Sequence, residues 1–483
     1  MLDFRPVGYV IGLLVAALGV TMFAPMMADA VAGNGHWPVF LQSAIIAIGG
    51  GGLTALACAN GVSEGLSIRQ TFLLTVLVWV ALPLFGALPF WLGQTQLRYT
   101  DAFFEAMSGL TTTGATVISG IDALPEGLKL WRGVLQWLGG IGIIVVAMVF
   151  LPELKVGGMQ IFRSEAFDTM GKILPRAAEI ASRISTIYVF LTFACALSYA
   201  ALGMNAFDAM VHAMTTISTG GFANTDASFG AFGAGIHYAA SAFMILAALP
   251  FVRFVQMISG GGMTPLLRDS QVHAFFGIIL ALVIVMSLWT ARTFHGFEEL
   301  AFRESLFNVV SILTGTGYAS ADYMQWGPFA VTIFFFTGLI GGCAGSTACS
   351  VKVFRYQLLF AAIKAQIRRI HSPHGIFTPR YQGRPVGEDV LNSVMAFFVA
   401  FMVGMGVIAV ALGMTGLDFI TSVSGAATAL ANVGPGLGTE IGPAGNFAGL
   451  NDTAKWILAI AMLFGRLEIL AVLTILSWRF WRG

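Results

Sequence analysis

The amino-acid sequence predicts an all-α polytopic membrane protein with a repeated internal architecture. Of its 483 residues, 57% are hydrophobic and only 10% are charged, whereas soluble domains carry roughly 25% charged residues. Ten stretches reach the length of about 20 mostly apolar residues that a bilayer-spanning helix needs. A shorter segment recurs four times, each time between two of these stretches. These observations predict four repeats of span, short helix and span behind a leading two-helix hairpin.

The recurring segment keeps one register in all four copies. The copies read DAFFEAMSGLTTTGAT from Asp101, DAMVHAMTTISTGGFA from Asp208, ESLFNVVSILTGTGYA from Glu304 and TSVSGAATALANVGPG from Thr421. Thirteen residues after each start lies a glycine: Gly114, Gly221, Gly317 and Gly434. One T-x-G string means little in a chain with 58 glycines, but four in matched register between spans indicate a shared role. We interpret each copy as a re-entrant pore helix followed by an extended segment.

Such an extended segment binds cations through its backbone. A potassium filter replaces the hydration shell of the ion with rings of backbone carbonyl oxygens, and glycine reaches the dihedral angles that this arrangement requires. A pore helix directs its negative C-terminal end at the pore, and its N-terminal end suits an acid such as Asp101, Asp208 or Glu304. We predict four segments around one pore, potassium as the permeant ligand and no cofactor in this chain. The predicted filter residues are Thr112, Thr113, Gly114, Thr219, Gly220, Gly221, Gly315, Thr316, Gly317, Asn432, Val433 and Gly434.

The predicted spans divide the chain into a hairpin and four repeats. They lie near residues 7–30, 38–59, 70–93, 131–150, 186–204, 236–257, 271–291, 327–350, 390–413 and 453–478. The hairpin covers residues 1–68 and contains no pore helix. The repeats cover residues 69–185, 186–270, 271–389 and 390–483.

The sequence resembles the pore subunit of the Trk-type potassium uptake systems, within the Trk/Ktr/HKT superfamily of cation transporters. The strings TTGAT, TGGFA, GTGYA and NVGPG fall where that family has its filter, and WLGGIGI and GRLEIL resemble further motifs. The resemblance covers essentially the whole chain. It implies potassium uptake across the bacterial inner (plasma) membrane by a homodimer in which each protomer has its own pore. It also implies gating by a cytosolic regulatory ring that binds nucleotides of the NAD or ATP type.

One position and one longer string depart from the pattern of that family. Gly315 stands where threonine is expected and is predicted to loosen the third filter strand. The string AGSTACSVKVFR replaces a more glycine-rich one after Cys343, which bears on gating more than on the choice of ion.

The distribution of lysine and arginine sets the orientation. With both termini in the cytoplasm, 18 of the 25 basic residues lie on the inner side, 6 lie outside and Arg466 lies within a span. The inner loop between Leu151 and Arg183 is long and mixed in charge, and we expect a short cytoplasmic helix there. A second inner loop carries Lys364, Arg368 and Arg369, which we interpret as a docking surface for a cytosolic partner. Anchoring of the topology by positive charge is the alternative.

Two features interrupt the spans and predict a gate. The glycine-rich segment 338–350 breaks the last span of the third repeat below the filter, and packing of small residues in an intact helix is the alternative. Arg466 lies inside the final span, where a charge is costly and functional by default. A structural pair with Glu468 is the alternative, although residues two apart do not face each other on one helix. We assign the gate to Arg466, Gly341, Gly342 and Gly345.

Three other functions remain open. A sodium-permeable member of the same superfamily would have serine in place of the first filter glycine, and Gly114 speaks against it. A secondary cation symporter with broken helices at the midplane would show two related halves rather than four. A membrane enzyme has the least support, because neither a Ser/His/Asp arrangement nor paired carboxylates are evident.

The amino-acid composition limits the kinds of molecule that the protein is expected to bind. The net charge of +1 argues against nucleic acid and leaves membrane lipid as the expected surrounding. The four cysteines lie in apolar or glycine-rich stretches and predict no disulfide framework. The seven histidines lack ligand spacing, and His212 in the second pore helix is expected to be packed or capped rather than bound to a metal.

Overall fold

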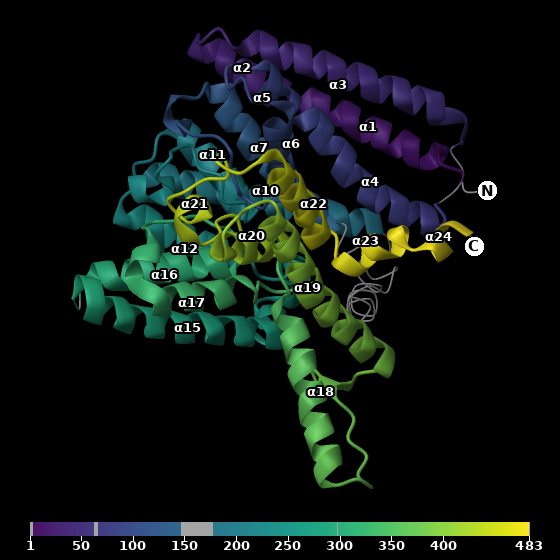
Figure 1. The fold of residues 1–483 in the computed structure, drawn as a ribbon, viewed down its shortest axis with the longest axis vertical. Helices are drawn as coiled ribbons and strands as arrows, with labels where there is room; N and C mark the ends of the chain where they lie inside the picture. The colour runs from purple at the N-terminus through teal and green to yellow at the C-terminus, as the bar shows by residue number, and fades with distance from the viewer. Residues whose placement is uncertain (1–2, 62–65, 146–176, 297, 483) are drawn as a thin grey trace.

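The computed structural model describes residues 3–61, 66–145, 177–296 and 298–482, and these form a bundle of helices (Figure 1). Its N-terminal hairpin consists of α1 (Arg5–Thr21), α2 (Phe23–Ala32) and α3 (Trp37–Cys58), followed by the 3-10 turn η1 (Ala59–Gly61). A side chain on Gly12 or Gly51 would collide with the backbone of the facing helix. Small residues therefore let α1 and α3 pack closely, as is common between membrane helices.

Each of the four repeats places a short helix between longer ones. The first contains α4 (Ile68–Gly86), α5 (Leu88–Leu92), α6 (Tyr99–Leu110), η2 (Ile121–Ala123) and α7 (Glu126–Val145). The second contains α10 (Ala177–Ala201), α11 (Ala206–Ile217), η4 (Ser228–Ala231), α12 (Ala234–Ala247), α13 (Phe251–Gln256), η5 (Met257–Gly261) and α14 (Thr264–Leu267).

The third and fourth repeats follow the same order. The third contains α15 (Ser270–Thr290), η6 (Ala291–His295), α16 (Glu299–Leu313), η7 (Tyr323–Trp326), α17 (Gly327–Gly338) and α18 (Val353–His371). Strands β1 (Arg380–Tyr381) and β2 (Arg384–Pro385) then form an antiparallel pair. The fourth contains α19 (Glu388–Met414), α20 (Phe419–Ala431), α21 (Gly438–Ile441), α22 (Asp452–Arg466), α23 (Ile469–Leu476) and α24 (Trp478–Arg482).

The spans are less regular than the sequence predicts. Six helices are long and apolar enough to cross a membrane, or up to eight if each of two bent pairs counts as one span, among the residues that the structure describes. The predicted span 236–257 bends by 87° between α12 and α13, where Pro250 disfavours a continuous helix. The predicted span 453–478 bends by 110° between α22 and α23, where Glu468 has a φ of 66°. A single straight helix is wrong at both places.

The pore helices α6, α11, α16 and α20 begin at residues that the recurring segment only partly locates. Asp101 and Asp208 lie in the first turns of α6 and α11, as predicted. Glu304 does not, because α16 already begins at Glu299. The fourth pore helix does carry an acid at its start, because Asp418 is the N-cap of α20 and accepts hydrogen bonds from the amides of residues 420 and 421.

Two segments that the sequence predicts to be cytoplasmic complete the description. Helix α18 and the β1–β2 turn project away from the rest of the bundle (Figure 1). The predicted cytoplasmic helix between residues 151 and 183 falls largely outside the described residues, as does the end of the predicted span 131–150.

Candidate functional site

The segments that follow the four pore helices share one backbone conformation. We call residues 112–114, 219–221, 315–317 and 432–434 the filter segments. Their last residues are the four predicted glycines, with φ of 84° at Gly114, 81° at Gly221, 85° at Gly317 and 92° at Gly434. Their first residues are left-handed as well, with φ of 52° at Thr112, 50° at Thr219, 76° at Gly315 and 52° at Asn432. Four separate stretches therefore make the same double turn.

Each filter segment is fixed to its own pore helix by an equivalent hydrogen bond. In every repeat the middle residue donates its N–H to the carbonyl five residues earlier. The donor–acceptor pairs are Thr113 to Ser108 at 2.9 Å, Gly220 to Thr215 at 2.8 Å, Thr316 to Ser311 at 2.9 Å and Val433 to Thr428 at 3.1 Å. Because this bond directs the middle N–H groups at the pore helices, the backbone amides of these residues are not free to face an ion.

The four filter segments lie against one another in a closed ring. A Cβ on Gly114 would collide with the carbonyl oxygen of Gly220, and one on Gly221 with that of Thr316. A Cβ on Gly317 would collide with the oxygen of Val433, and one on Gly434 with that of Thr113. Each glycine thus abuts the middle carbonyl of the next repeat, and the fourth returns to the first. No side chain fits at these four positions without displacing a carbonyl.

Gly315 preserves the backbone shape of the third filter segment. Its φ matches the left-handed region that its three counterparts also occupy, and glycine adopts this region without the penalty of roughly 1–2 kcal/mol that a residue with a Cβ incurs. The hydroxyls of Thr314 and Thr316 pair at 2.8 Å, as those of Thr111 and Thr113 do at 2.7 Å. The third filter segment therefore follows the same backbone path as the other three, and its loosening by Gly315 stays a prediction.

A buried ion pair lies beside the ring of filter glycines. A small cavity of about 80 Å³ touches all four filter glycines and is also lined by Arg132. The Arg132 guanidinium pairs with Glu105 at 2.9 Å and donates to the carbonyl of Ala223, 2.7 Å away in the next repeat. Arg132 is 2% exposed and Glu105 is fully buried. Sequence reasoning missed this pair, although a lone arginine near the start of a span was a possible signal.

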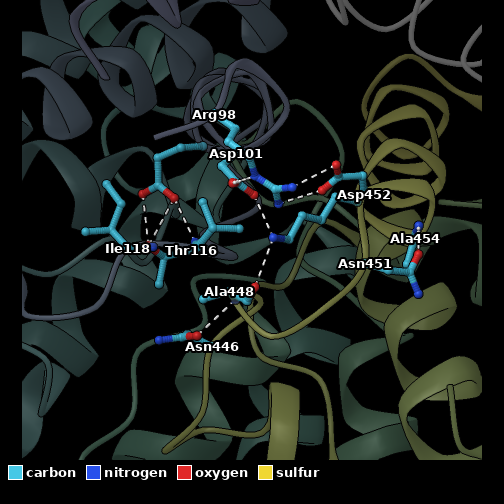
Figure 2. A network of polar contacts seen from close by, with 12 residues as sticks. Arg98, Asp101, Thr116, Ile118, Asn446, Ala448, Asn451, Asp452 and Ala454 are labelled. Atoms are coloured by element: carbon cyan, nitrogen blue, oxygen red, sulfur yellow. Dashed lines mark hydrogen bonds and ion pairs between the residues drawn. The ribbon is translucent and has the colours of Figure 1, made fainter. Parts of the chain in front are cut away.

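A second pair joins the first repeat to the fourth. Lys455 of α22 donates to Asp101 of α6 at 2.6 Å and to the carbonyl of Ala448 at 2.9 Å. Figure 2 shows the adjoining exposed pair, in which Arg98 lies 2.6 Å from Asp452. The acid at the start of the first pore helix is therefore neutralised by a buried lysine of another repeat, rather than acting only on its own helix.

The interruption predicted for the third repeat is present as a buried, non-helical loop. We call residues 339–352, between α17 and α18, the intramembrane loop. Gly341 and Gly345 have left-handed backbones in this loop, with φ of 83° and 73°. A side chain on Gly342 would collide with Ala348 and Ala248. Its anchors to other helices are Cys343 N–H to Ala248 O at 3.0 Å, Thr347 hydroxyl to Ala247 O at 3.0 Å, Phe251 N–H to Gly345 O at 2.9 Å and Ala344 N–H to Gln271 Oε1 at 2.9 Å. The loop is thus attached at the 87° bend of the second repeat.

Arg466 ends α22 beside this loop. Its guanidinium donates to the Sγ of Cys349 and, at 2.8 Å, to the carbonyl of Gly139, and its side chain is buried. Glu468 pairs instead with Arg355 of α18, so the alternative of an Arg466–Glu468 pair is wrong. The loop reaches the filter too, because a Cβ on Gly315 would lie 3.7 Å from the amide of Cys349. Arg466 and the intramembrane loop, which contains Gly341, Gly342 and Gly345, therefore meet at Cys349, and Cys349 lies next to the third filter segment.

His212 is held within the second repeat. Its Nδ1 lies 2.8 Å from the carbonyl of Asp208 and its Nε2 accepts from the amide of Asn224 at 3.3 Å. No cluster of three His, Cys, Asp or Glu side chains that could hold a metal occurs in the described part of the chain. His212 is thus buried and hydrogen-bonded within its own repeat.

Comparison with known proteins agrees with this architecture. The family model "TrkH: Cation transport protein" matches residues 36–480. The Trk system potassium uptake protein TrkI of Halomonas elongata is 47% identical over 416 residues, which are 86% of this chain and 84% of that protein. The Trk system potassium uptake protein TrkH of Escherichia coli K12 is 37% identical over 489 residues, which cover 100% of both chains.

A solved structure confirms the predicted fold class. The crystal structure of the potassium transporter TrkH from Vibrio parahaemolyticus superimposes with a TM-score of 0.90 at 35% identity, covering 100% of both chains. Together with the apolar helices, this makes the chain an integral membrane protein. These relatives are named as potassium uptake proteins and the solved structure as a potassium transporter, and transporters are not enzymes. The chain therefore belongs to the TrkH family of cation transport proteins.

Proposed function

We propose that this protein takes up potassium through a pore bounded by the four filter segments. The observation that carries the proposal is the closed ring in which each filter glycine abuts the middle carbonyl of the next repeat. Rings of backbone carbonyls replace the hydration shell of potassium, and the relatives compared above are named as potassium uptake proteins. Gly114, rather than serine, at the first glycine position favours potassium over sodium.

Arg466 and the intramembrane loop form the closed barrier next to the filter. Lys352, Arg355 and Arg466 are all buried there, and Glu468 is the carboxylate that pairs with Arg355. A fixed positive charge near a narrow path opposes a cation, because burial strengthens electrostatic interactions. The loop adds a steric plug beside the same arginine. Opening requires both elements to move away from the third filter segment.

A cytosolic nucleotide-binding ring controls this barrier from the inner side. Lys364, Arg368 and Arg369 lie exposed on α18, the helix that begins directly after the intramembrane loop and projects from the bundle (Figure 1). A partner that binds there acts on the loop through one continuous helix. The protein works as a homodimer in the bacterial inner membrane with both termini in the cytoplasm.

Uptake of ⁸⁶Rb⁺ and ²²Na⁺ into liposomes that contain the purified protein tests the function. We expect Gly114→Ser and Gly434→Ser to lower the Rb⁺/Na⁺ flux ratio, because a side chain at either position displaces a middle carbonyl. Gly203→Ser is the matched control, since Gly203 is also left-handed at a φ of 100° but has open space around it. The proposal is wrong if both filter variants keep the ratio of the unaltered protein.

A further inference from the structure

The second filter segment is held by a side chain from the preceding repeat. Gln136 lies on α7 and is fully buried. Its Nε2 donates to the carbonyl of Gly220 at 2.6 Å, and its Oε1 accepts from the amide of Phe222 at 3.1 Å. One side-chain amide therefore bridges the two backbone groups on either side of Gly221.

Gly220 is unusual among the middle residues of the filter segments. The corresponding residues of the other repeats are Thr113, Thr316 and Val433, all of which are β-branched. Gly220 does not have a left-handed φ, so its backbone does not require glycine. The three heavy atoms nearest to a Cβ built on Gly220 all belong to the Gln136 side chain. The glutamine thus occupies the space that a β-branched side chain fills in the other three repeats.

The hydrogen bond from Gln136 also makes the Gly220 carbonyl different from the other three middle carbonyls of the ring. The middle carbonyls of Thr113, Thr316 and Val433 accept no hydrogen bond from the residues that the structure describes. The carbonyl of Gly220 accepts one, and a carbonyl oxygen retains a second lone pair for an ion. The amide of Gln136 therefore fixes the direction of this carbonyl and competes with a cation for its electron density.

We propose that Gln136 is a specificity-determining positioning residue, which sets the orientation of the Gly220 carbonyl and takes the place of the missing side chain in the second filter segment. This inference rests on the proposed function, because it assigns a role within the potassium filter. Without the amide, the Gly220 carbonyl is free to turn, and a carbonyl that turns adapts to the smaller sodium ion. Gln136 thus supports discrimination from outside the filter segments.

Removal of the amide is the first test. Gln136→Leu keeps the approximate size of the side chain and loses both hydrogen bonds. We expect the Rb⁺/Na⁺ flux ratio in liposomes to fall about three- to tenfold, the factor that corresponds to the loss of the one hydrogen bond that holds the Gly220 carbonyl, and the apparent KM for Rb⁺ to rise. Gln271→Leu is the matched control, because it removes a buried glutamine that contacts the intramembrane loop through Ala344. It is expected to change the uptake rate and not the ratio.

A second test exchanges the sizes of the side chains at residues 136 and 220. Its expected result, a double variant more active than a single one, would not follow from general destabilisation. Gly220→Thr alone is expected to abolish uptake, because its side chain collides with Gln136. Combined with Gln136→Ala, the same threonine finds free space, and the second segment then resembles the first and third. We expect the double variant to regain uptake.

The outcomes separate this inference from the proposed function. If Gly114→Ser lowers the flux ratio while Gln136→Leu leaves it unchanged, or if the double variant is no more active than Gly220→Thr, the role of Gln136 is overturned and the filter stands. If neither Gly114→Ser nor Gly434→Ser changes the ratio, the filter assignment itself fails.

Discussion

The guanidinium of Arg466 donates a hydrogen bond to the Sγ of Cys349, a residue 117 positions earlier in the chain. This contact joins the last residue of α22 to the intramembrane loop of the third repeat. The same guanidinium reaches the carbonyl of Gly139 in the first repeat at 2.8 Å. One buried arginine thus connects three of the four repeats next to the filter, and its Nε has no hydrogen-bond partner in the described residues.

Replacement of Arg466 by alanine is expected to raise uptake in the absence of any partner protein. At 5–6 Å and an effective dielectric constant near 20, a fixed charge opposes a cation by about 3 kcal/mol, which is roughly a hundredfold in occupancy. The measurement is ⁸⁶Rb⁺ uptake into liposomes, with the Rb⁺/Na⁺ ratio expected to stay constant. Arg466→Lys keeps the charge and serves as the control. An altered ratio in Arg466→Ala would instead give the arginine a filter-supporting role.

Charge reversal on α18 is expected to abolish regulation and preserve the pore. We predict that the triple change of Lys364, Arg368 and Arg369 to glutamate removes the nucleotide-dependent change in uptake, because these side chains are exposed on the projecting helix. Uptake without the partner should persist. Reversal of Arg479 and Arg482 on α24 is the control for inner-side charge in general. Regulation that survives the triple reversal would reduce the basic stretch to a topological anchor.

The buried Arg132–Glu105 pair and the exposed Arg98–Asp452 pair are expected to differ sharply in their contribution to stability. Arg132→Leu leaves Glu105 buried without its cation and should cost about 3–5 kcal/mol. Arg98→Ala breaks the pair with Asp452, whose side chains are 64% and 48% exposed, together with the contact of Arg98 to Asp101 at 3.3 Å. It should cost at most about 1 kcal/mol. Thermal unfolding in detergent compares the two. Equal losses of stability in the two variants would contradict a stronger contribution from the buried pair. Replacement of both Arg132 and Glu105 by leucine should recover part of the stability that Arg132→Leu loses.

Asp418 is expected to make the stability of the fourth pore helix sensitive to acid. Hydrogen bonding to the side chain of Thr421, together with the amides of Thr421 and Ile420, lowers the pKa of Asp418 from its usual 3.8. A lowered pKa in the folded state means that the stabilisation is complete above the usual pKa and is lost as the pH falls through the folded value. Asp418→Asn should retain the cap and remove this acid dependence, whereas Asp418→Ala should cost about 1 kcal/mol at neutral pH. Unfolding temperatures at neutral pH and below about pH 4 distinguish the variants.

The sequence predicts those parts of the fold that depend on local chemistry. The filter glycines stand in one register because each repeat makes the same left-handed turn after its pore helix, and this requirement is readable from one segment at a time. The start of a pore helix is less readable, since several acids compete for it. The recurring segment points to Glu304 in the third repeat, although α16 begins at Glu299, and it does not include Asp418, the N-cap of α20.

Contacts between repeats were not predictable from the sequence. Gln136 and Gly220 are 84 residues apart, and neither residue type by itself indicates that one fills the space of the other. The buried partners of Arg132 and Lys455 depend likewise on the order in which the repeats surround the ring. The bend after Arg466 also escaped prediction, because the residues on both sides are good helix formers and Glu468 is held by Arg355 from a different helix.

The closed ring of filter segments comes from a single polypeptide, and this fixes the stoichiometry of the pore at translation. A channel built from four separate subunits receives every substitution in fourfold dosage and can mix with paralogous subunits in the same membrane. Here a feature of one repeat, such as glycine at residue 315 or the Gln136 side chain that packs against Gly220, occurs only once in the ring. Selection can therefore adjust ion preference in small increments, and no related chain can enter the ring and dilute it.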